Sequence, residues 1–431
     1  MMSKAKIIRD PLYGFIEFPP SISQLLGTLP LIRLTRIKQL AHTFLVYPSA
    51  IHSRFEHSIG VYHLAGLMAD RLNLEKERKE IVQLAALLHD IGHGPYSHPF
   101  EEVMVSVTGD ENFSHEDAAK VIIEYDDSLK NLLCDKKIKG IVEIYGNQGQ
   151  SLESEIISGS IDADKLDYLR RDSYHTGVAY GIFDIERILR TLTPIEEGDR
   201  KFLGILEKGM YALESYRLAR YSMHTQVYEH KTRLITDDMF IRAVKLSIEE
   251  GILDPDSINP RKNPELFVRE YLKLDDYSVL YKILAGNDTK RSRSKVLVDR
   301  LLKRDLFKSA FSIYLNQHDI PDSLKRERLV KMSKKEVAEI EKKISDEAQI
   351  PLEDVILHVQ SSKIKLYEKL GEDEFLEHDK LLIKREKEVV AFNEITPFSL
   401  KQKTIRQLFV FCPNEYKEKV NKITPSILGI K

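Results

Sequence analysis

Apolar residues recur three or four positions apart through most of the segment between Glu56 and Arg304. Ile81, Leu84 and Leu88 show this spacing clearly. Because an α-helix has 3.6 residues per turn, residues at this spacing lie on one helical face. The pattern therefore predicts a mainly α fold.

The two ends of the chain carry different patterns. Residues 7–18 alternate around a Pro and a Gly, which predicts a short extended ribbon with a turn. Near the other end, 354–361 and 407–413 have the composition of strands, whereas 415–421 is helical in character. We therefore expect a small C-terminal α+β lobe.

A loss of periodicity after residue 250 marks a boundary. Gly251 and Pro255 begin a stretch rich in helix breakers. The sequence thus predicts three parts: a core at 1–250, a helical extension at 251–345 and the α+β lobe at 346–431.

Charge and cysteine content exclude several classes of protein. The chain has 65 Lys and Arg against 67 Asp and Glu, a formal net charge of −2, which argues against a histone-like nucleic-acid binder. Its two cysteines, Cys134 and Cys412, form neither a disulfide framework nor a thiolate cluster for zinc. No apolar run reaches the roughly 18 residues of a membrane span. We expect a cytoplasmic protein in a reducing environment, with no membrane partner.

The most informative stretch is an apolar helix that ends in His89 and Asp90. An imidazole next to a carboxylate at a helix end can turn toward one cation, and a buried charge needs such a partner. His57 lies upstream and Asp164 downstream. Two His and two Asp suit one divalent metal per site, with Mn, Fe, Mg and Zn all left open, and leave positions for water and a phosphate oxygen.

The segment around Asp164 strengthens this interpretation. At 100° per residue Asp164, Lys165, Tyr168 and Asp172 fall within about 100° of one another. One helix face then offers a metal ligand, a cation, a phenol and a carboxylate. The charge pattern alone also fits a solvated face with local ion pairs, and a lone buried His is more often a hydrogen-bonded core residue.

Taken together, the motifs resemble the HD-domain phosphohydrolase superfamily, whose metal pattern H…HD…D is matched by His57, His89-Asp90 and Asp164. More closely, the chain is similar to the deoxynucleoside-triphosphate triphosphohydrolases, including the dGTPases and the animal branch. The matching blocks occur in order at Ile7–Gly14, Arg33–Leu40, His52–Ser58, His89–His98, Asp162–Asp172 and Tyr228–Lys231. The resemblance implies that the helical core is an HD domain.

The resemblance also implies a reaction, in which water attacks the α-phosphorus of a dNTP and releases a deoxynucleoside and tripolyphosphate. It implies His115 as the catalytic histidine and Glu116 as its neighbouring acid, with His93 and Glu101 in support. An imidazole that titrates near neutrality can pass a proton to the leaving oxygen. The family commonly has Asp where this chain has Glu101, so a longer side chain must fit the same network.

Eight substrate-binding positions follow from the same resemblance. They are Arg54, His98, Lys165 and Arg220 for the phosphates, Tyr168 as a hydroxyl donor, Gln39 and Asp172 for the sugar 3′-hydroxyl, and Tyr228 for the base pocket. From the residues alone, Arg54 could instead pair with Glu56, and Arg220 could be a surface residue.

Regulation and assembly are less constrained. Oligomers are usual in this family, which implies a homodimer or homotetramer. In the animal branch a guanine nucleotide occupies an activating site, but the matching positions here are Gly27, Ile32 and Thr35. Gly and Ile side chains cannot hydrogen-bond a guanine edge. We expect no activation by GTP through this set, and a differently built nucleotide effector site is left open.

Two alternatives remain. The HD site could cleave another phosphoester, such as an alarmone or a cyclic dinucleotide, although Gln39, Lys165, Tyr168 and Asp172 argue against it. A basic cluster over 290–308 would suit a nucleic-acid-binding module, but such a run is usually a solvated helix face.

Overall fold

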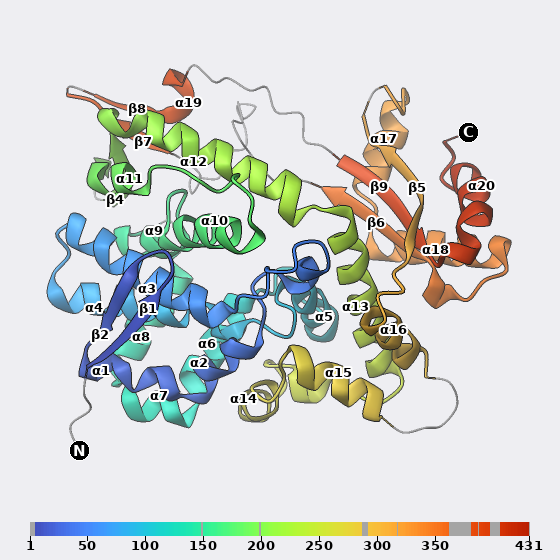
Figure 1. The fold of residues 1–431 in the computed structure, drawn as a ribbon, viewed down its shortest axis with the longest axis horizontal. Coiled ribbons are helices and arrows are strands. Elements are labelled where there is room, and N and C mark those ends of the chain that lie inside the picture. Colours follow the sequence, from blue (N-terminus) through green and yellow to red (C-terminus); the bar gives the residue numbers. More distant parts are fainter. Residues whose placement is uncertain are drawn as a thin grey trace. The chain divides into compact units, whose positions relative to one another are not determined.

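The computed structural model describes residues 5–147, 150–197, 200–286, 292–316, 318–361, 381–386, 388–396 and 406–430. These residues are mostly helical, which confirms the mainly α fold (Figure 1). The chain separates into two compact units. Unit 1 comprises Met1–Tyr228, Asp254–Tyr281 and Leu366–Leu400, and unit 2 comprises Glu229–Leu253, Lys282–Lys365 and Lys401–Lys431.

Three helices form the centre of unit 1. Helix α3 (Arg54–Arg71) packs against α4 (Lys76–Leu88) and α10 (Ala163–Thr176). The apolar face expected on α4 is buried at Leu84 and Leu88. The other helical segments placed wholly or partly in unit 1 are α1 (Pro20–Ser23), α2 (Leu29–Arg33), α5 (His98–Thr108), α6 (His115–Tyr125), α7 (Asp127–Leu132), α8 (Asp135–Gly146), α9 (Leu152–Ser158), α11 (Ile185–Thr191), α12 (Met210–Met223), the π-helical turn η6 (His224–Tyr228), α14 (Pro264–Tyr271), α15 (Asp276–Ala285) and α19 (Phe392–Ile395).

The expected N-terminal ribbon is present in unit 1. Strands β1 (Lys6–Asp10) and β2 (Gly14–Phe18) pair antiparallel. Phe18 is fully buried and stacks on Tyr62 of α3, with ring centroids 4.6 Å apart. This contact fixes the ribbon against the central helices.

Unit 1 also contains strands within the segment expected to be mainly helical. Strands β3 (Leu192–Glu197) and β4 (Arg200–Leu206) pair antiparallel and extend through β7 (Leu382–Lys384) and β8 (Val389–Ala391) in the order β3-β4-β7-β8. The first two strands are short and their apolar content resembles that of the flanking helices, so helical spacing did not separate them.

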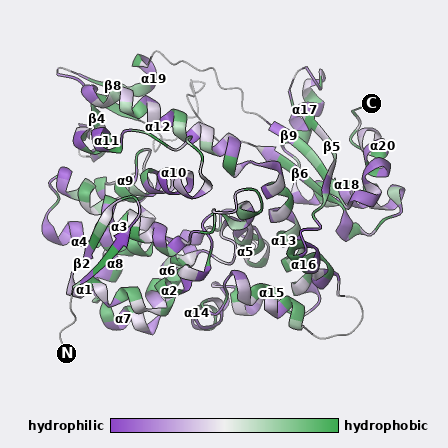
Figure 2. Cartoon of the chain, in the orientation of Figure 1, coloured by the Kyte–Doolittle hydropathy of each residue, from purple (hydrophilic) through white to green (hydrophobic). Residues whose placement is uncertain are grey.

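Unit 2 contains the expected α+β lobe. Its sheet has the order β5-β9-β6, formed by β5 (Lys308–Tyr314), β9 (Arg406–Cys412) and β6 (Ile356–Ser361). Figure 2 shows apolar residues along β9, and five of its seven residues are buried. The helices of this unit are α13 (Lys231–Glu249), α16 (Arg293–Leu302), α17 (Ser323–Val330), α18 (Lys334–Ala348) and α20 (Lys417–Ile427). Strand β5 begins before residue 346, and the three-part division by residue number stays a prediction.

Candidate functional site

The end of α4 orients the first pair of candidate metal ligands. The helix gives way after Leu88 to a 3₁₀ turn, η4 (His89–Gly92). His89 Nδ1 lies 2.8 Å from the Ala86 carbonyl, which can only accept, so Nδ1 carries the proton. His89 Nε2 is buried and has no hydrogen-bond partner among the described residues. Its lone pair is therefore available to a cation.

The four candidate ligands converge on this atom. One ligand atom from each of His57, His89 and Asp90 lies within 4.8 Å of the other two. Asp164 Oδ1 lies 2.9 Å from His57 Nε2 and 3.8 Å from His89 Nε2. Helices α3, α4 and α10 thus bring together residues that are far apart in the sequence.

A further carboxylate orients His57. Its Nδ1 lies 2.8 Å from Asp167 Oδ2, and Arg171 donates to both oxygens of Asp167. A Cβ at Gly60 would lie 1.9 Å from Asp167 Oδ1, so only glycine lets α3 approach α10 this closely. A carboxylate that holds the far nitrogen of a ligand histidine is the usual outer partner in metal sites.

The charge balance around His57 fits a divalent ion. Burial lowers the pKa of His57, but the hydrogen bonds that its ring donates to Asp164 and Asp167 outweigh burial and raise the pKa to about 10. An imidazolium thus supplies the positive charge that the carboxylates require. A cation held by His57, His89, Asp90 and Asp164 would supply the same charge, with the nitrogen and oxygen ligands that transition metals accept.

Arg54 connects this cluster to the next loop. Its Nη1 donates to Asp90 Oδ2 at 2.7 Å and its Nε donates to Ser97 Oγ at 2.7 Å. Burial raises the pKa of Asp90, but Arg54 and the neighbouring imidazoles outweigh it, and the net pKa is well below the usual range. Glu56 instead caps α3 through Ser53. The guanidinium is therefore directed into the site.

A second cluster lies beside the first. His93 Nδ1, His98 Nδ1 and His115 Nδ1 lie 2.9, 3.1 and 3.1 Å from the same oxygen, Glu101 Oε1. The rings of His93 and His115 stack with centroids 3.8 Å apart. His93 Nε2 also lies 3.3 Å from Asp90 Oδ1 and so joins the two clusters.

Close packing of α6 on η4 brings His115 to this position. A Cβ at Gly92 would lie 1.9 Å from the His115 carbonyl oxygen, so any larger residue would push α6 away. Burial lowers the pKa of His115, but Glu101 outweighs it and raises the pKa to about 9. His93 is the opposite case, since burial lowers its pKa to about 3. The cluster thus pairs a protonated imidazole with a neutral one.

A third group surrounds Asp172 on α10. His52 Nε2 lies 2.7 Å from Asp172 Oδ1, and the Tyr228 hydroxyl donates to Asp172 Oδ2 at 2.7 Å. Gln39 is buried, and its Oε1 has no hydrogen-bond partner in the part of the chain that the structure describes. The Tyr228 and Tyr168 rings lie 6.1 Å apart.

The remaining predicted residues lie at different distances from the ligands. The Tyr168 ring is 6.5 Å from the His57 ring, whereas Lys165 Nζ lies 2.5 Å from Asp162 Oδ2. Burial raises the pKa of Tyr168, and Arg220 lies close enough to oppose this rise in part. Glu116 lines an open hollow of about 490 Å³ together with His115.

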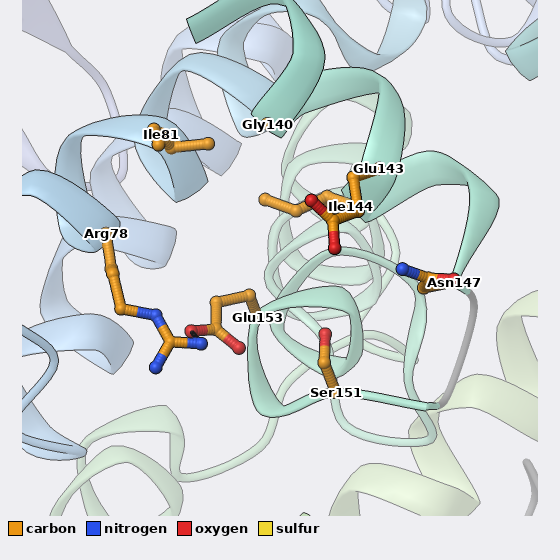
Figure 3. Close-up of a pocket in the computed structure, with 8 residues that line it drawn as sticks. All are labelled: Arg78, Ile81, Gly140, Glu143, Ile144, Asn147, Ser151 and Glu153. Atoms are coloured by element: carbon orange, nitrogen blue, oxygen red, sulfur yellow. Dashed lines mark ion pairs between the residues drawn. The ribbon is translucent and has the colours of Figure 1, made fainter. Parts of the chain in front are cut away.

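Another hollow, of about 160 Å³, is lined by α4, α8, α9 and the loop between α8 and α9. Figure 3 shows the Arg78 guanidinium beside the Glu153 carboxylate, and these side chains form an ion pair. Its other lining residues include Ile81, Ile144 and Ser151. It contains none of the candidate site residues.

Three supporting residues escaped sequence analysis, namely Asp167, His52 and Asp276. Asp167 lies three positions after Asp164 and could have been found from that helical spacing. His52 and Asp276 had no such signal, because their partners are distant in sequence.

The fold and the cluster of His and Asp side chains define an HD domain. A family model described as an HD domain matches residues 54–172, and one described as an HD associated region matches residues 183–431. The chain belongs to the HD-domain phosphohydrolase family and carries the HD associated region.

Individual relatives support this assignment. An uncharacterized protein of Methanocaldococcus jannaschii is 33% identical, over 97% of this chain and 83% of its own length. The deoxynucleoside triphosphate triphosphohydrolase SAMHD1 homolog of Dictyostelium discoideum is 32% identical over 73% of this chain, and the match spans 62% of that relative. The crystal structure of a phosphohydrolase from Bacteroides thetaiotaomicron has a TM-score of 0.73 at 26% identity, and covers 95% of this chain and 99% of its own. Among the described helices, none is long and apolar enough to cross a membrane.

Proposed function

We propose that the protein hydrolyses deoxynucleoside triphosphates to a deoxynucleoside and tripolyphosphate, by attack of water at the α-phosphorus. The observation that carries this proposal is the convergence of His57, His89, Asp90 and Asp164 beside a cluster of imidazoles on Glu101. The similarity to a deoxynucleoside triphosphate triphosphohydrolase supports the choice of substrate.

We assign His57, His89, Asp90 and Asp164 as the residues that would hold one divalent metal. Such an ion would supply Lewis-acid activation of water and neutralise charge at the α-phosphate. Asp167 and the Ala86 carbonyl orient the two imidazoles, so both nitrogen lone pairs are aimed before substrate arrives.

His115 is the proposed general acid. With its pKa raised to about 9 by Glu101, the imidazole is protonated at neutral pH and can donate to the departing oxygen. Glu101 then stabilises the charged ring and fixes its orientation. His93 stays neutral and packs on His115, which limits the positions that the acid can take. We place Glu116 in a supporting role next to His115.

Substrate contacts are proposed for three regions. Arg54 contacts Asp90 of the first cluster and His98 contacts Glu101 of the second, so both can meet phosphate oxygens. Gln39 and Asp172 are proposed to hold the sugar 3′-hydroxyl. Gln39 has a buried oxygen without a partner among the described residues, whereas Asp172 would have to share an oxygen with Tyr228 or His52. Lys165, Tyr168 and Arg220, together with Tyr228 at the base pocket, complete the proposed set. Lys165 would have to leave Asp162 to reach a phosphate.

The test is chromatography of the products from each dNTP, with added Mn or Mg. Release of tripolyphosphate and deoxynucleoside supports the proposal, whereas orthophosphate or a monophosphate contradicts it. Asp164→Ala should lower activity by at least about 100-fold, since loss even of an outer partner costs 10- to 100-fold. Asp127→Ala is the matched control, because its side chain is 90% exposed on α7.

The alternatives have their own tests. A screen with alarmones and cyclic dinucleotides in the same assay separates another phosphoester substrate from dNTPs. For nucleic-acid binding, Lys290 and Arg291 of the basic cluster lie outside the described residues. Arg293, Arg300 and Lys303 contact Glu249, Glu415 and Asp299 respectively, which disfavours a free basic surface. We also propose a homo-oligomer, which light scattering would test.

A further inference from the structure

Three imidazole nitrogens of unit 1 face one carboxylate oxygen. His93, His98 and His115 each direct Nδ1 to Glu101 Oε1, at 2.9–3.1 Å. The four side chains come from η4 and its following loop, from the first turn of α5 and from the start of α6. One ligand atom of each can lie within 4.8 Å of every other.

These separations are close to those of a tetrahedral metal site. With zinc–nitrogen and zinc–oxygen distances of about 2.0–2.1 Å, the ligand atoms of a tetrahedron lie about 3.3 Å apart. The nitrogen–oxygen separations here are 2.9–3.1 Å. Small side-chain rotations would therefore admit an ion between the four atoms.

Hydrogen bonding around His93 leaves a place for a cation. His93 Nε2 lies 3.3 Å from Asp90 Oδ1, and a carboxylate oxygen accepts, so Nε2 is the nitrogen placed to donate. The Nδ1 lone pair then faces Glu101 Oε1, which also can only accept. His93 is 1% exposed, and within the described ranges Nδ1 has no hydrogen-bond partner. Two opposed lone pairs at this distance call for a positive charge between them.

We propose that His93, His98, Glu101 and His115 bind a second divalent cation, separate from the ion of the HD motif. Three imidazoles and one carboxylate suit zinc, whose structural and catalytic sites use nitrogen and oxygen ligands in this number. Zinc binding here does not depend on which substrate the HD site takes. Zinc would occupy Nδ1 of His115, the nitrogen that otherwise faces Glu101 when the ring acts as the general acid. Zinc at this site would therefore inhibit the proposed reaction.

The experiment measures metal binding directly. The full chain is stripped with chelator, dialysed against Zn²⁺ or Co²⁺, and its bound metal is counted by elemental analysis. Wild type should bind two equivalents, and the Co²⁺ form should show visible absorption of tetrahedral intensity. His98→Ala should bind one equivalent tightly and the other at least about tenfold more weakly. His98 is chosen because its side chain is 60% exposed, so folding should survive its loss.

Two matched variants separate this site from the HD motif. Asp164→Ala should weaken metal binding at the HD motif and keep the tetrahedral Co²⁺ absorption of the second site. Glu101→Gln should remove that absorption. His318→Ala removes a fully exposed histidine of unit 2 and should leave both equivalents unchanged. A wild-type chain that binds a single equivalent overturns the proposal, as does a His98→Ala, Glu101→Gln double variant that still binds two. Either result leaves the test of dNTP hydrolysis intact.

Discussion

Glu101 illustrates how one side chain sets the chemistry of several others. Its carboxylate contacts three imidazoles and raises the pKa of His115 to about 9, whereas burial keeps His93 neutral. Burial raises the pKa of Glu101 itself, but the imidazoles outweigh it and keep the group ionised. The family commonly has Asp at this position. The longer Glu side chain of this protein nevertheless fits the network, because its carboxylate reaches all three rings.

The pH dependence of hydrolysis should follow His115. Because the proposed general acid acts when protonated, activity is lost as pH rises through its pKa of about 9. Glu101→Gln removes the charge that raises this pKa, so the alkaline limb of kcat/KM should move to lower pH. The profile is measured with Mg and without zinc, and Glu111→Gln, an exposed carboxylate near α6, serves as the control. An unmoved limb would contradict the assignment of His115.

Glu155 gives a prediction about stability. Burial raises its pKa from 4.5 to about 7, and the Leu203 amide that donates to it opposes this only in part. The folded state therefore holds the proton more tightly than the unfolded state, and stability falls as pH rises from about 4.5 to 7. Glu155→Gln should raise the free energy of unfolding at pH 8 by about 1–3 kcal/mol and change little at pH 4. Urea denaturation at the two pH values measures this difference, and equal effects at both would refute it.

At the scale of elements, α15 supports a turn beside the site. Tyr96 and Ser97 have φ values of 58° and 64°, a backbone conformation that residues other than glycine rarely adopt. Buried Asp276 accepts from the Tyr96 amide at 2.6 Å and from the Lys38 amide at 3.0 Å. Ser97 in turn accepts from Arg54. A residue of the HD associated region thus holds a strained loop of the HD domain.

Asp276→Asn tests this support. The amide presents N–H groups where an acceptor is required, so the free energy of unfolding should fall by about 1–3 kcal/mol. The loss of activity should exceed the loss of folded protein, because Ser97 would no longer be held in place to accept the hydrogen bond from Arg54. Chemical denaturation and kcat under folding conditions give the two readouts. Glu265→Gln on α14 is a control, since this residue is exposed and its substitution should change neither.

At the scale of the molecule, the ligands of the HD motif come from three helices of unit 1 and are held by its core. An ion bound to the folded state alone adds stability, about 2.7 kcal/mol at 100 times its Kd. Unit 2 has its own apolar cluster, which includes Ile344, Leu408 and Val420. Stability gained from the metal should therefore appear in unit 1.

Metal removal tests this division. Chelator should lower the Tm of the calorimetric transition of unit 1, and restored Mn or Mg should raise it again. Asp164→Ala should abolish the metal-dependent shift. Hydrogen exchange would localise the effect, because amides of α3, α4 and α10 should lose protection while those of β9 should not. Equal loss in both units would contradict the expectation.

Sequence alone determined what depends on local pattern. Helical spacing predicted the mainly α fold, alternation predicted the ribbon, and the types of residue around His89 predicted a candidate metal centre. These follow from backbone geometry and ligand chemistry, which act over a few residues. The strands β3 and β4 were missed because short apolar runs fit either period.

Tertiary structure decided which side chains meet. Arg54 pairs with Asp90 rather than Glu56, and Lys165 turns to Asp162 although it shares a helix face with Asp164. Glycine at position 92 lets α6 bring His115 to Glu101. Such contacts join residues distant along the chain, and they are selected by burial and close packing, which no local pattern of residues records.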